Sequence, residues 1–146
     1  MLKNPRVIGV KNSSMPIQDI EEFRAEGCLV FNGPDEQLLS GLVAGASGGI
    51  GGTYGAMPEL YNKIFALVQE NRITEARPIQ DDCLKIIQKL CSGHGNMYGM
   101  IKQTLRINHS LDCGSVRAPL AELIEADYAI AQEAAQMIKT AIAKYC

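Results

Sequence analysis

The spacing of apolar residues changes character near residue 72 of the chain. Before that point, short apolar runs of strand length alternate with stretches whose apolar residues have helical spacing. The runs cover residues 6–11 and 28–31, and a glycine-rich third strand or loop covers residues 47–55. Because parallel strands need crossover helices, three strand-then-helix units predict a parallel β/α architecture.

The intervening helices are predicted from apolar stripes and from the residues that begin and end them. Pro16 stands in the first turn of the first helix, which Gly27 ends. The second helix begins at Asp35, and Pro58 begins the third. The three apolar faces are Ile17, Ile20 and Phe23; Leu38, Leu39, Leu42, Val43 and Ala46; and Leu60, Ile64, Leu67 and Val68.

From Ile73 onward every apolar pattern is helical. Loops are predicted at residues 92–96 and 113–115 and around Pro119. The three stripes are Ile79, Cys83, Ile86, Ile87 and Leu90; Met97, Met100, Ile101, Leu105 and Ile107; and Leu123, Tyr128, Ile130, Ala134, Met137, Ile138 and Ile142.

Three β/α units cannot close a sheet on themselves. An open sheet of three parallel strands leaves an unpaired edge and an uncovered apolar face. Either another polypeptide segment completes the sheet, or the sheet is built differently.

Composition and charge narrow the class of protein. The 146 residues are 47% apolar and 21% charged with a net charge of −2, which is ordinary for one soluble globular domain. This balance does not favour binding to nucleic acid or to an anionic membrane. The longest apolar stretches are short and broken by glycine, so none is able to span a bilayer, and the N-terminus lacks the apolar core of a signal peptide. We therefore expect a cytoplasmic protein.

The cysteines and histidines do not form a site by spacing. The five cysteines have no CxxC pair and no histidine at ligand spacing, which predicts reduced thiols and neither a disulfide framework nor a metal centre. His94 and His109 are expected to have structural roles. The cysteines are Cys28, Cys83, Cys91, Cys113 and Cys146.

Lys11 is the first candidate for chemistry, because it ends the first predicted strand and small polar residues follow it. In parallel β/α folds, the carboxyl ends of the strands line the active site. Apolar neighbours there would desolvate the ammonium, and a neutral amine is what a Schiff-base nucleophile requires. The alternative is an ordinary solvated lysine.

Asp35 and Glu36 are adjacent and come just after the end of the second strand. Two carboxylates at the start of a helix complement its dipole, which is a purely structural role. The same groups are also able to accept hydrogen bonds from a polyhydroxylated ligand.

A third pattern resembles the nucleotide-binding turn of short-chain dehydrogenases. It is the stretch 45–51, and Tyr98 with Lys102 supplies the Tyr-x-x-x-Lys pair of those enzymes. However, the residues before this turn have helical spacing, and Pro58 delays the next helix beyond the place where pyrophosphate would bind. The context therefore disfavours a dehydrogenase.

Three segments together resemble strand motifs six, seven and eight of the pyruvate-dependent class I aldolases, the family of N-acetylneuraminate lyase and dihydrodipicolinate synthase. They are residues 8–14 (IGVKNSS), 31–36 (FNGPDE) and 44–54 (AGASGGIGGTY), and their order and spacing agree with the family. The second segment favours the sialate lyase branch.

The resemblance implies an α/β fold, the C-terminal half of a (β/α)8 TIM barrel with a C-terminal helical extension. Residues 1–72 would be β/α units six to eight, and residues 73–146 would be the extension of the same domain. Strands one to five would lie outside this chain, so we expect a homo-oligomer or pairing with a missing N-terminal half barrel.

The resemblance also implies a reaction. Lys11 would form a covalent imine with pyruvate or with a keto-acid substrate, without any further cofactor or metal. Ser13 would lie near the substrate, while Gly33, Asp35 and Glu36 would hold its polyhydroxylated part. The implied reaction is the cleavage of N-acetylneuraminate to pyruvate and N-acetylmannosamine.

Gly52 occupies a substrate-binding position at which sialate lyases usually have a serine. A dihydrodipicolinate synthase-like activity or a 2-keto-3-deoxy sugar acid therefore stays open as an alternative. The family's pyruvate-carboxylate loop and its proton-shuttling tyrosine also lie outside the chain. A non-catalytic half barrel or assembly module is the alternative of another class.

Overall fold

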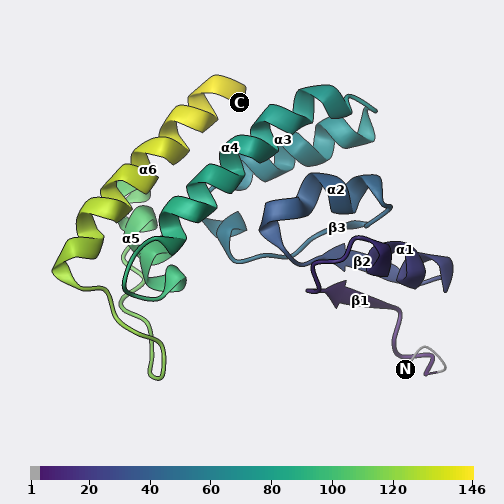
Figure 1. Ribbon diagram of the computed structural model, residues 1–146, viewed down its shortest axis with the longest axis horizontal. Helices are drawn as coiled ribbons and strands as arrows, with labels where there is room; N and C mark the ends of the chain where they lie inside the picture. Colours follow the sequence, from purple (N-terminus) through teal and green to yellow (C-terminus); the bar gives the residue numbers. More distant parts are fainter. Residues whose placement is uncertain (1–3) are drawn as a thin grey trace. The chain divides into compact units, whose positions relative to one another are not determined.

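The computed structural model describes residues 4–146, which alternate strands with helices and then continue as helices (Figure 1). These residues form two compact units. The sheet unit holds the chain up to Gly51 together with Tyr61–Gln80, and the helical unit holds Gly52–Leu60 together with Asp81–Cys146.

The sheet unit is built on three parallel strands, as the sequence predicts. They are β1 (Gly9–Asn12), β2 (Leu29–Asn32) and β3 (Gly48–Gly49), in the order β1-β2-β3. Lys11 lies opposite Phe31 across the first pair of strands. β3 is only two residues long, because glycines have little intrinsic preference for a strand.

The strand boundaries differ from those predicted. The first two strands were expected at residues 6–11 and 28–31, but each ends one residue later, at an asparagine. Asn12 pairs with Asn32, and the carbonyl of Asn32 accepts a 2.9 Å hydrogen bond from Ile50 N–H. Backbone pairing therefore extends the strands through residues that local propensity assigns to turns.

Two helices contact the strands. α1 (Gln18–Ala25) contacts β1 and β2, and α2 (Leu38–Val43) contacts β2 and β3. The helix predicted from Asp35 begins instead as a 3₁₀ turn, η1 (Asp35–Gln37). Val43 was expected on the buried face but is exposed at the last residue of α2. The core between strands and helices comprises Ile20, Val30, Ala44 and Ala46, with Val10, Ile17, Phe23 and Cys28 packed against it.

The opposite face of the sheet carries exposed side chains. Lys11 is exposed there, and Leu29 keeps 47% of its surface accessible. Within residues 4–146, β1 and β3 each pair only with β2. The open sheet expected from three β/α units is thus present.

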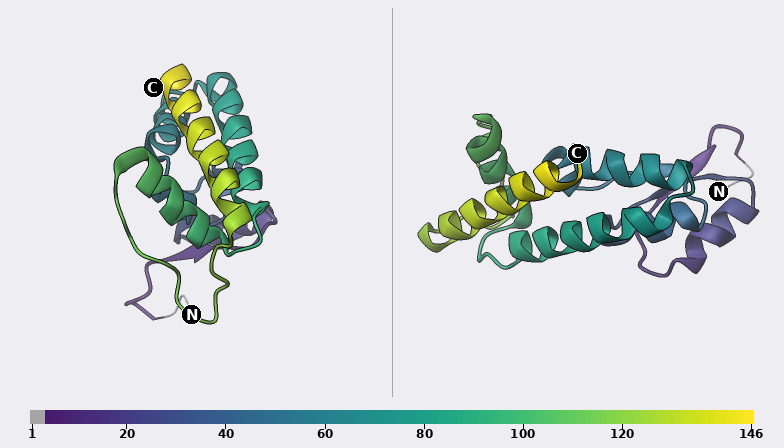
Figure 2. Two further views of the ribbon diagram at one scale, coloured as in Figure 1. Left: turned by 90° about the vertical axis from the view of Figure 1, so that its left-hand side faces the viewer. Right: turned by 90° about the horizontal axis from the view of Figure 1, so that it is seen from above.

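Four longer helices follow, as the apolar stripes predict. They are α3 (Pro58–Gln69), α4 (Ile73–Cys91), α5 (Met97–His109) and α6 (Glu125–Tyr145), and α3 and α4 each supply residues to both units. In the helical unit α5 packs against α6, and Figure 2 shows the long connection that joins them. No helix among the described residues is both long and apolar enough to cross a bilayer.

Two expectations for the last helix are wrong. Leu123 was placed inside it, but α6 begins at Glu125, because the Ile124 N–H bonds to the Asp127 carboxylate and Ile124 becomes the N-cap. Tyr128 was placed on the packed stripe, but it is exposed on the first turn.

The end of α6 is fastened to α4 through one carboxylate. Asp82 accepts hydrogen bonds from Lys85 and Lys144 Nζ and from the Tyr145 hydroxyl at 2.8 to 3.1 Å. The bonds from Lys85, Tyr145 and Lys144 outweigh partial burial and lower the pKa of Asp82 to about 2.

Gly41 offers a test of packing between α2 and β2. An added Cβ would lie 2.4 Å from Asn32 Oδ1, and Asn32 is fully buried. We therefore expect Gly41→Ala to destabilise the protein by about 1 to 2 kcal/mol, although alanine normally favours a helix. Urea unfolding measures this change in free energy.

The matched control is Gly55→Ala, because a Cβ there meets no atom within 4 Å. That variant should be neutral or slightly stabilising, by up to about 1 kcal/mol. Equal stability of the two variants would contradict the close contact between Gly41 and Asn32.

Candidate functional site

Lys11 projects from the exposed face of the sheet at the carboxyl end of β1. Side chains alternate between the two faces of a strand. Val10 packs into the core under the helices, Lys11 is exposed on the other face, and Asn12 is buried again. The amine therefore lies on the face that the helices leave open, next to Phe31 of β2. Apolar neighbours were expected to desolvate it, but within residues 4–146 the Lys11 side chain is exposed to solvent.

Gly33 brings the ends of β1 and β2 into contact. Its N–H donates a 2.8 Å hydrogen bond to the Asn12 carbonyl, and a Cβ on it would lie 2.7 Å from Ser13 Oγ. Only glycine permits this approach. The structure thus brings together the predicted site residues Ser13 and Gly33.

Asp35 and Glu36 lie in η1, the turn that follows β2. Asp35 is buried, whereas Glu36 is exposed. The two adjacent carboxylates therefore have different environments, so a solvent-borne ligand meets Glu36 more readily than Asp35.

Gln80, which the sequence reasoning missed, holds this turn in place. Its Nε2 donates to the Asp35 carbonyl at 3.1 Å, and its Oε1 accepts from Leu39 N–H at 2.9 Å. The side chain thereby satisfies one of the unpaired N–H groups at the start of α2. Its position three residues before Cys83 and seven before Ile87 on the apolar stripe of α4 was the available signal.

The turn after Lys11 is tied to α1. Ser14 N–H donates to Asn12 Oδ1 at 3.3 Å, and the Ser14 hydroxyl contacts both Asn12 Oδ1 and an oxygen of Asp19. A serine hydroxyl has one proton, so it donates to one of these two acceptors at a time. These contacts anchor Ser13 between two fixed neighbours.

Gly52 lies in the helical unit, at the N-cap of η2 (Thr53–Gly55). A Cβ on Gly52 would lie 3.0 Å from the ring of Tyr98 and 3.4 Å from its hydroxyl oxygen. The ring of Tyr98 therefore limits the space for any side chain at position 52.

The glycine-rich stretch does not form a nucleotide-binding turn. Gly45 follows α2 with a φ of 99°, and Gly48 and Gly49 form β3. A dinucleotide turn instead leaves a strand and enters a helix. The order of elements excludes the dehydrogenase interpretation of residues 45–51.

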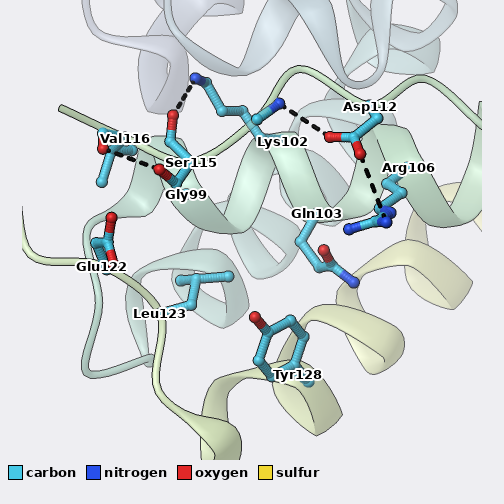
Figure 3. Close-up of a pocket in the computed structure, with 11 residues that line it drawn as sticks. Gly99, Lys102, Gln103, Arg106, Asp112, Ser115, Val116, Glu122, Leu123 and Tyr128 are labelled. Carbon is cyan, nitrogen blue, oxygen red and sulfur yellow. Dashed lines mark hydrogen bonds and ion pairs between the residues drawn. The ribbon is translucent and has the colours of Figure 1, made fainter.

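The Tyr-x-x-x-Lys pair has other partners. Lys102 Nζ donates to the carbonyl oxygens of Ser115 and Cys113 at 2.7 and 3.1 Å, at the edge of a cavity of about 270 Å³ in the helical unit (Figure 3). The ammonium of Lys102 therefore holds the loop between α5 and α6, and it does not serve Tyr98 in proton transfer.

No histidine or cysteine lies on the described strands or in the turns that follow β1 and β2. His94 N–H donates to the buried Asp127 carboxylate at 2.7 Å, in agreement with a structural role. None of the five cysteines, all of which lie among the described residues, forms a disulfide. Among the residues that the structure describes, no group of three or more histidine, cysteine or acidic side chains is arranged to hold a metal ion.

Parallel strands joined by crossover helices, with polar side chains at the carboxyl ends of the strands, are typical of part of a (β/α)8 barrel. The chain belongs to the dihydrodipicolinate synthetase family, whose model matches residues 1–140.

Individual relatives belong to the sialate lyase branch. The chain is 57% identical to N-acetylneuraminate lyase of Mediterraneibacter gnavus, over 99% of its own length and 47% of the relative's. A structure titled Ruminococcus gnavus sialic acid aldolase catalytic lysine mutant matches with a TM-score of 0.97 and 55% identity, over all of this chain and 49% of the other.

A more distant structure is N-acetylneuraminate lyase from Fusobacterium nucleatum complexed with pyruvate. Its TM-score is 0.86 at 29% identity, over 94% of this chain and 46% of the other. The chain thus spans about half the length of the relatives it matches.

Proposed function

We propose that this chain supplies the imine-forming half of a Schiff-base aldolase that cleaves a 2-keto sugar acid, with N-acetylneuraminate as the substrate. The observation that carries the proposal is the position of Lys11 at the carboxyl end of β1, on the open face of the sheet. Lys11 is the only lysine on a strand within residues 4–146. A closely similar structure is titled as a catalytic lysine mutant, which agrees with this role.

The reaction needs no metal and no cofactor other than the imine. The neutral Lys11 amine attacks the C2 keto group, and loss of water forms an iminium ion. The iminium accepts the electron pair of the C3–C4 bond as that bond breaks and the C4 hydroxyl loses its proton. The products are N-acetylmannosamine and an enamine, and protonation at C3 followed by hydrolysis releases pyruvate and restores Lys11.

The remaining predicted site residues are proposed to bind the end of the substrate that lies away from the keto group. We assign the carbonyl of Gly33 and the carboxylates of Asp35 and Glu36 as acceptors for sugar hydroxyl groups. Ser13, which contacts Gly33, lies between this group and Lys11 along the chain. We expect the reaction to take place in the cytoplasm.

Reductive trapping tests the proposal. The protein is incubated with pyruvate and borohydride, and the adduct is mapped by peptide mass spectrometry. We expect one adduct, on Lys11. An unmodified Lys11 in a protein that retains its folded spectrum would contradict the proposal.

An assembly role is a second candidate function, favoured by the open face of the sheet. Ile8 is 72% exposed just before β1, and Leu29 is half exposed beside it on β2. Such a surface favours pairing with another strand-bearing polypeptide, either a second copy or a complementary half barrel. Sedimentation velocity should detect an oligomer, and a monomer that binds no hydrophobic dye would contradict this role.

Gly52→Ser tests the sugar preference. The serine hydroxyl would add a hydrogen-bonding group at a position proposed to meet the sugar, so we expect the kcat/KM ratio of N-acetylneuraminate to a 2-keto-3-deoxy sugar acid to rise about two- to tenfold. Tyr98 is half exposed and is able to yield the few tenths of an ångström that the new Cβ needs.

Gly55→Ser is the matched control, because its Cβ meets open space. It should leave the ratio of the two substrates unchanged. A ratio that stays constant in Gly52→Ser as well would remove Gly52 from the proposed site.

A further inference from the structure

Two asparagines end the two strands that carry the proposed site. Asn12 and Asn32 are the last residues of β1 and β2, and they lie opposite each other in the parallel pair. Both are buried, with 6% and 0% of their surface exposed. They follow Val10 and Val30 on the face toward the helices, so they lie on the side of the sheet opposite to Lys11.

Each asparagine side chain is hydrogen-bonded to the turn just beyond its strand. Asn12 Oδ1 accepts from Ser14 N–H at 3.3 Å and from the Ser14 hydroxyl at 2.7 Å. Asn32 Nδ2 donates to the Pro34 carbonyl at 2.7 Å. Both contacts span two residues, and side-chain bonds of this kind set the course of a turn.

These turns contain the residues proposed to meet the substrate. The turn held by Asn12 begins one residue after Lys11 and encloses Ser13. The turn held by Asn32 encloses Gly33 and leads directly into Asp35. Gly33 N–H also bonds to the Asn12 carbonyl, so the two turns are joined to each other.

Neither asparagine is explained by stability alone. Asn12 Nδ2 and Asn32 Oδ1 are buried side-chain atoms without a hydrogen-bond partner. A buried polar atom without a partner destabilises the fold, whereas leucine has nearly the same size and no such atom. Residues that break a local rule in this way are expected where function requires them.

We propose that Asn12 and Asn32 are positioning residues, and that each positions the turn for a different end of the substrate. Asn12 sets the turn beside Lys11, which receives the keto-acid end, and Asn32 sets the Gly33–Glu36 turn, which receives the sugar end. The division rests on the proposed aldolase function.

The two leucine variants should separate the two ends of the substrate. Asn12→Leu should slow reductive trapping of pyruvate about 10- to 100-fold, because small misplacement of a reacting group has effects of this size. Asn32→Leu should trap pyruvate within about twofold of the unmodified protein but raise KM for the sugar acid about tenfold. A merely structural role would slow trapping, raise KM and lower Tm together in both variants.

The aspartate variants distinguish acceptor from donor. Asn12→Asp keeps the oxygen that accepts from Ser14, so it should trap pyruvate faster than Asn12→Leu. Asn32→Asp loses the donor and places a carboxylate against the Pro34 carbonyl, so it should not recover sugar binding. Recovery in both aspartate variants, or in neither, would overturn the proposal.

Amide hydrogen exchange provides a readout that does not depend on catalysis. Asn12→Leu should speed exchange at Ser14 N–H, and Asn32→Leu should speed exchange at Gln37 N–H, which bonds to the Pro34 carbonyl. If the unmodified protein traps no pyruvate, the aldolase function fails while these exchange rates still test the turns. Unchanged exchange at both sites would overturn the positioning role.

Discussion

Lys11→Ala should abolish reductive trapping of pyruvate, the largest functional effect expected for any single substitution in this chain. The imine requires a primary amine on the open face of the sheet, and Lys11 is the only strand lysine among residues 4–146. The variant should keep its Tm, because an exposed side chain contributes little to packing. Intact-protein mass spectrometry after borohydride treatment measures the adduct.

Two further lysine variants test whether the loss of the pyruvate adduct is specific to the Lys11 amine. Lys11→Arg should also form no adduct, because a guanidinium stays protonated and cannot act as an amine nucleophile. Lys139→Ala, which changes an exposed lysine of α6, should trap pyruvate as well as the unmodified protein does. An adduct that persists in Lys11→Ala would assign the chemistry to another lysine.

The architecture around Lys11 was predictable because it depends on local patterns. β-branched and aliphatic runs marked β1 and β2, and helical spacing marked the intervening helices, so the parallel order followed from the need for crossovers. The predicted ends of the first two strands were wrong, because pairing overrides propensity there. Asn32 belongs to β2 because Asn12 pairs with it and Ile50 N–H donates to its carbonyl.

The parts of the candidate site that were missed depend on contacts between distant residues. Gln80 reaches Leu39 across 41 positions of sequence, and no local pattern specifies that pairing. The contact between Ser13 and Gly33 likewise appears only when two strand ends meet. Motifs could therefore nominate Lys11 and Asp35, but the groups that hold them in place required the folded chain.

The contacts of Asp127 in the helical unit likewise could not be predicted from local sequence patterns. Substitution of Asp127 has the largest expected effect on stability. An acidic residue in the first turn of α6 suggests only a favourable interaction with the helix dipole. In the structure its buried carboxylate accepts backbone hydrogen bonds from His94, Gly95 and Ile124 at 2.7 to 3.0 Å. It therefore joins the turn after α4 to the start of α6.

Asp127→Asn should lower Tm at pH 7 on the order of 5 to 10 °C. Both carboxylate oxygens accept backbone N–H groups, so an amide nitrogen at either position faces a donor and leaves it unpaired. Thermal unfolding followed by circular dichroism measures the change. Asp81→Asn, an exposed change on α4, is the control and should leave Tm nearly unchanged.

The loss of Tm caused by Asp127→Asn should become smaller in acid. The direction of the shift in the Asp127 pKa defines the pH range of this change. The N–H of Ile124, and then those of His94 and Gly95, hold the pKa of Asp127 at about 2, below the ordinary value of 3.8. A depressed pKa stabilises the fold fully above pH 4, and this stabilisation disappears as the pH falls through about 2. The difference in Tm between the unmodified protein and the variant should thus be constant from pH 7 to about 5 and then narrow. A difference that is independent of pH down to 2 would mean that the ionised carboxylate is not what joins α4 to α6.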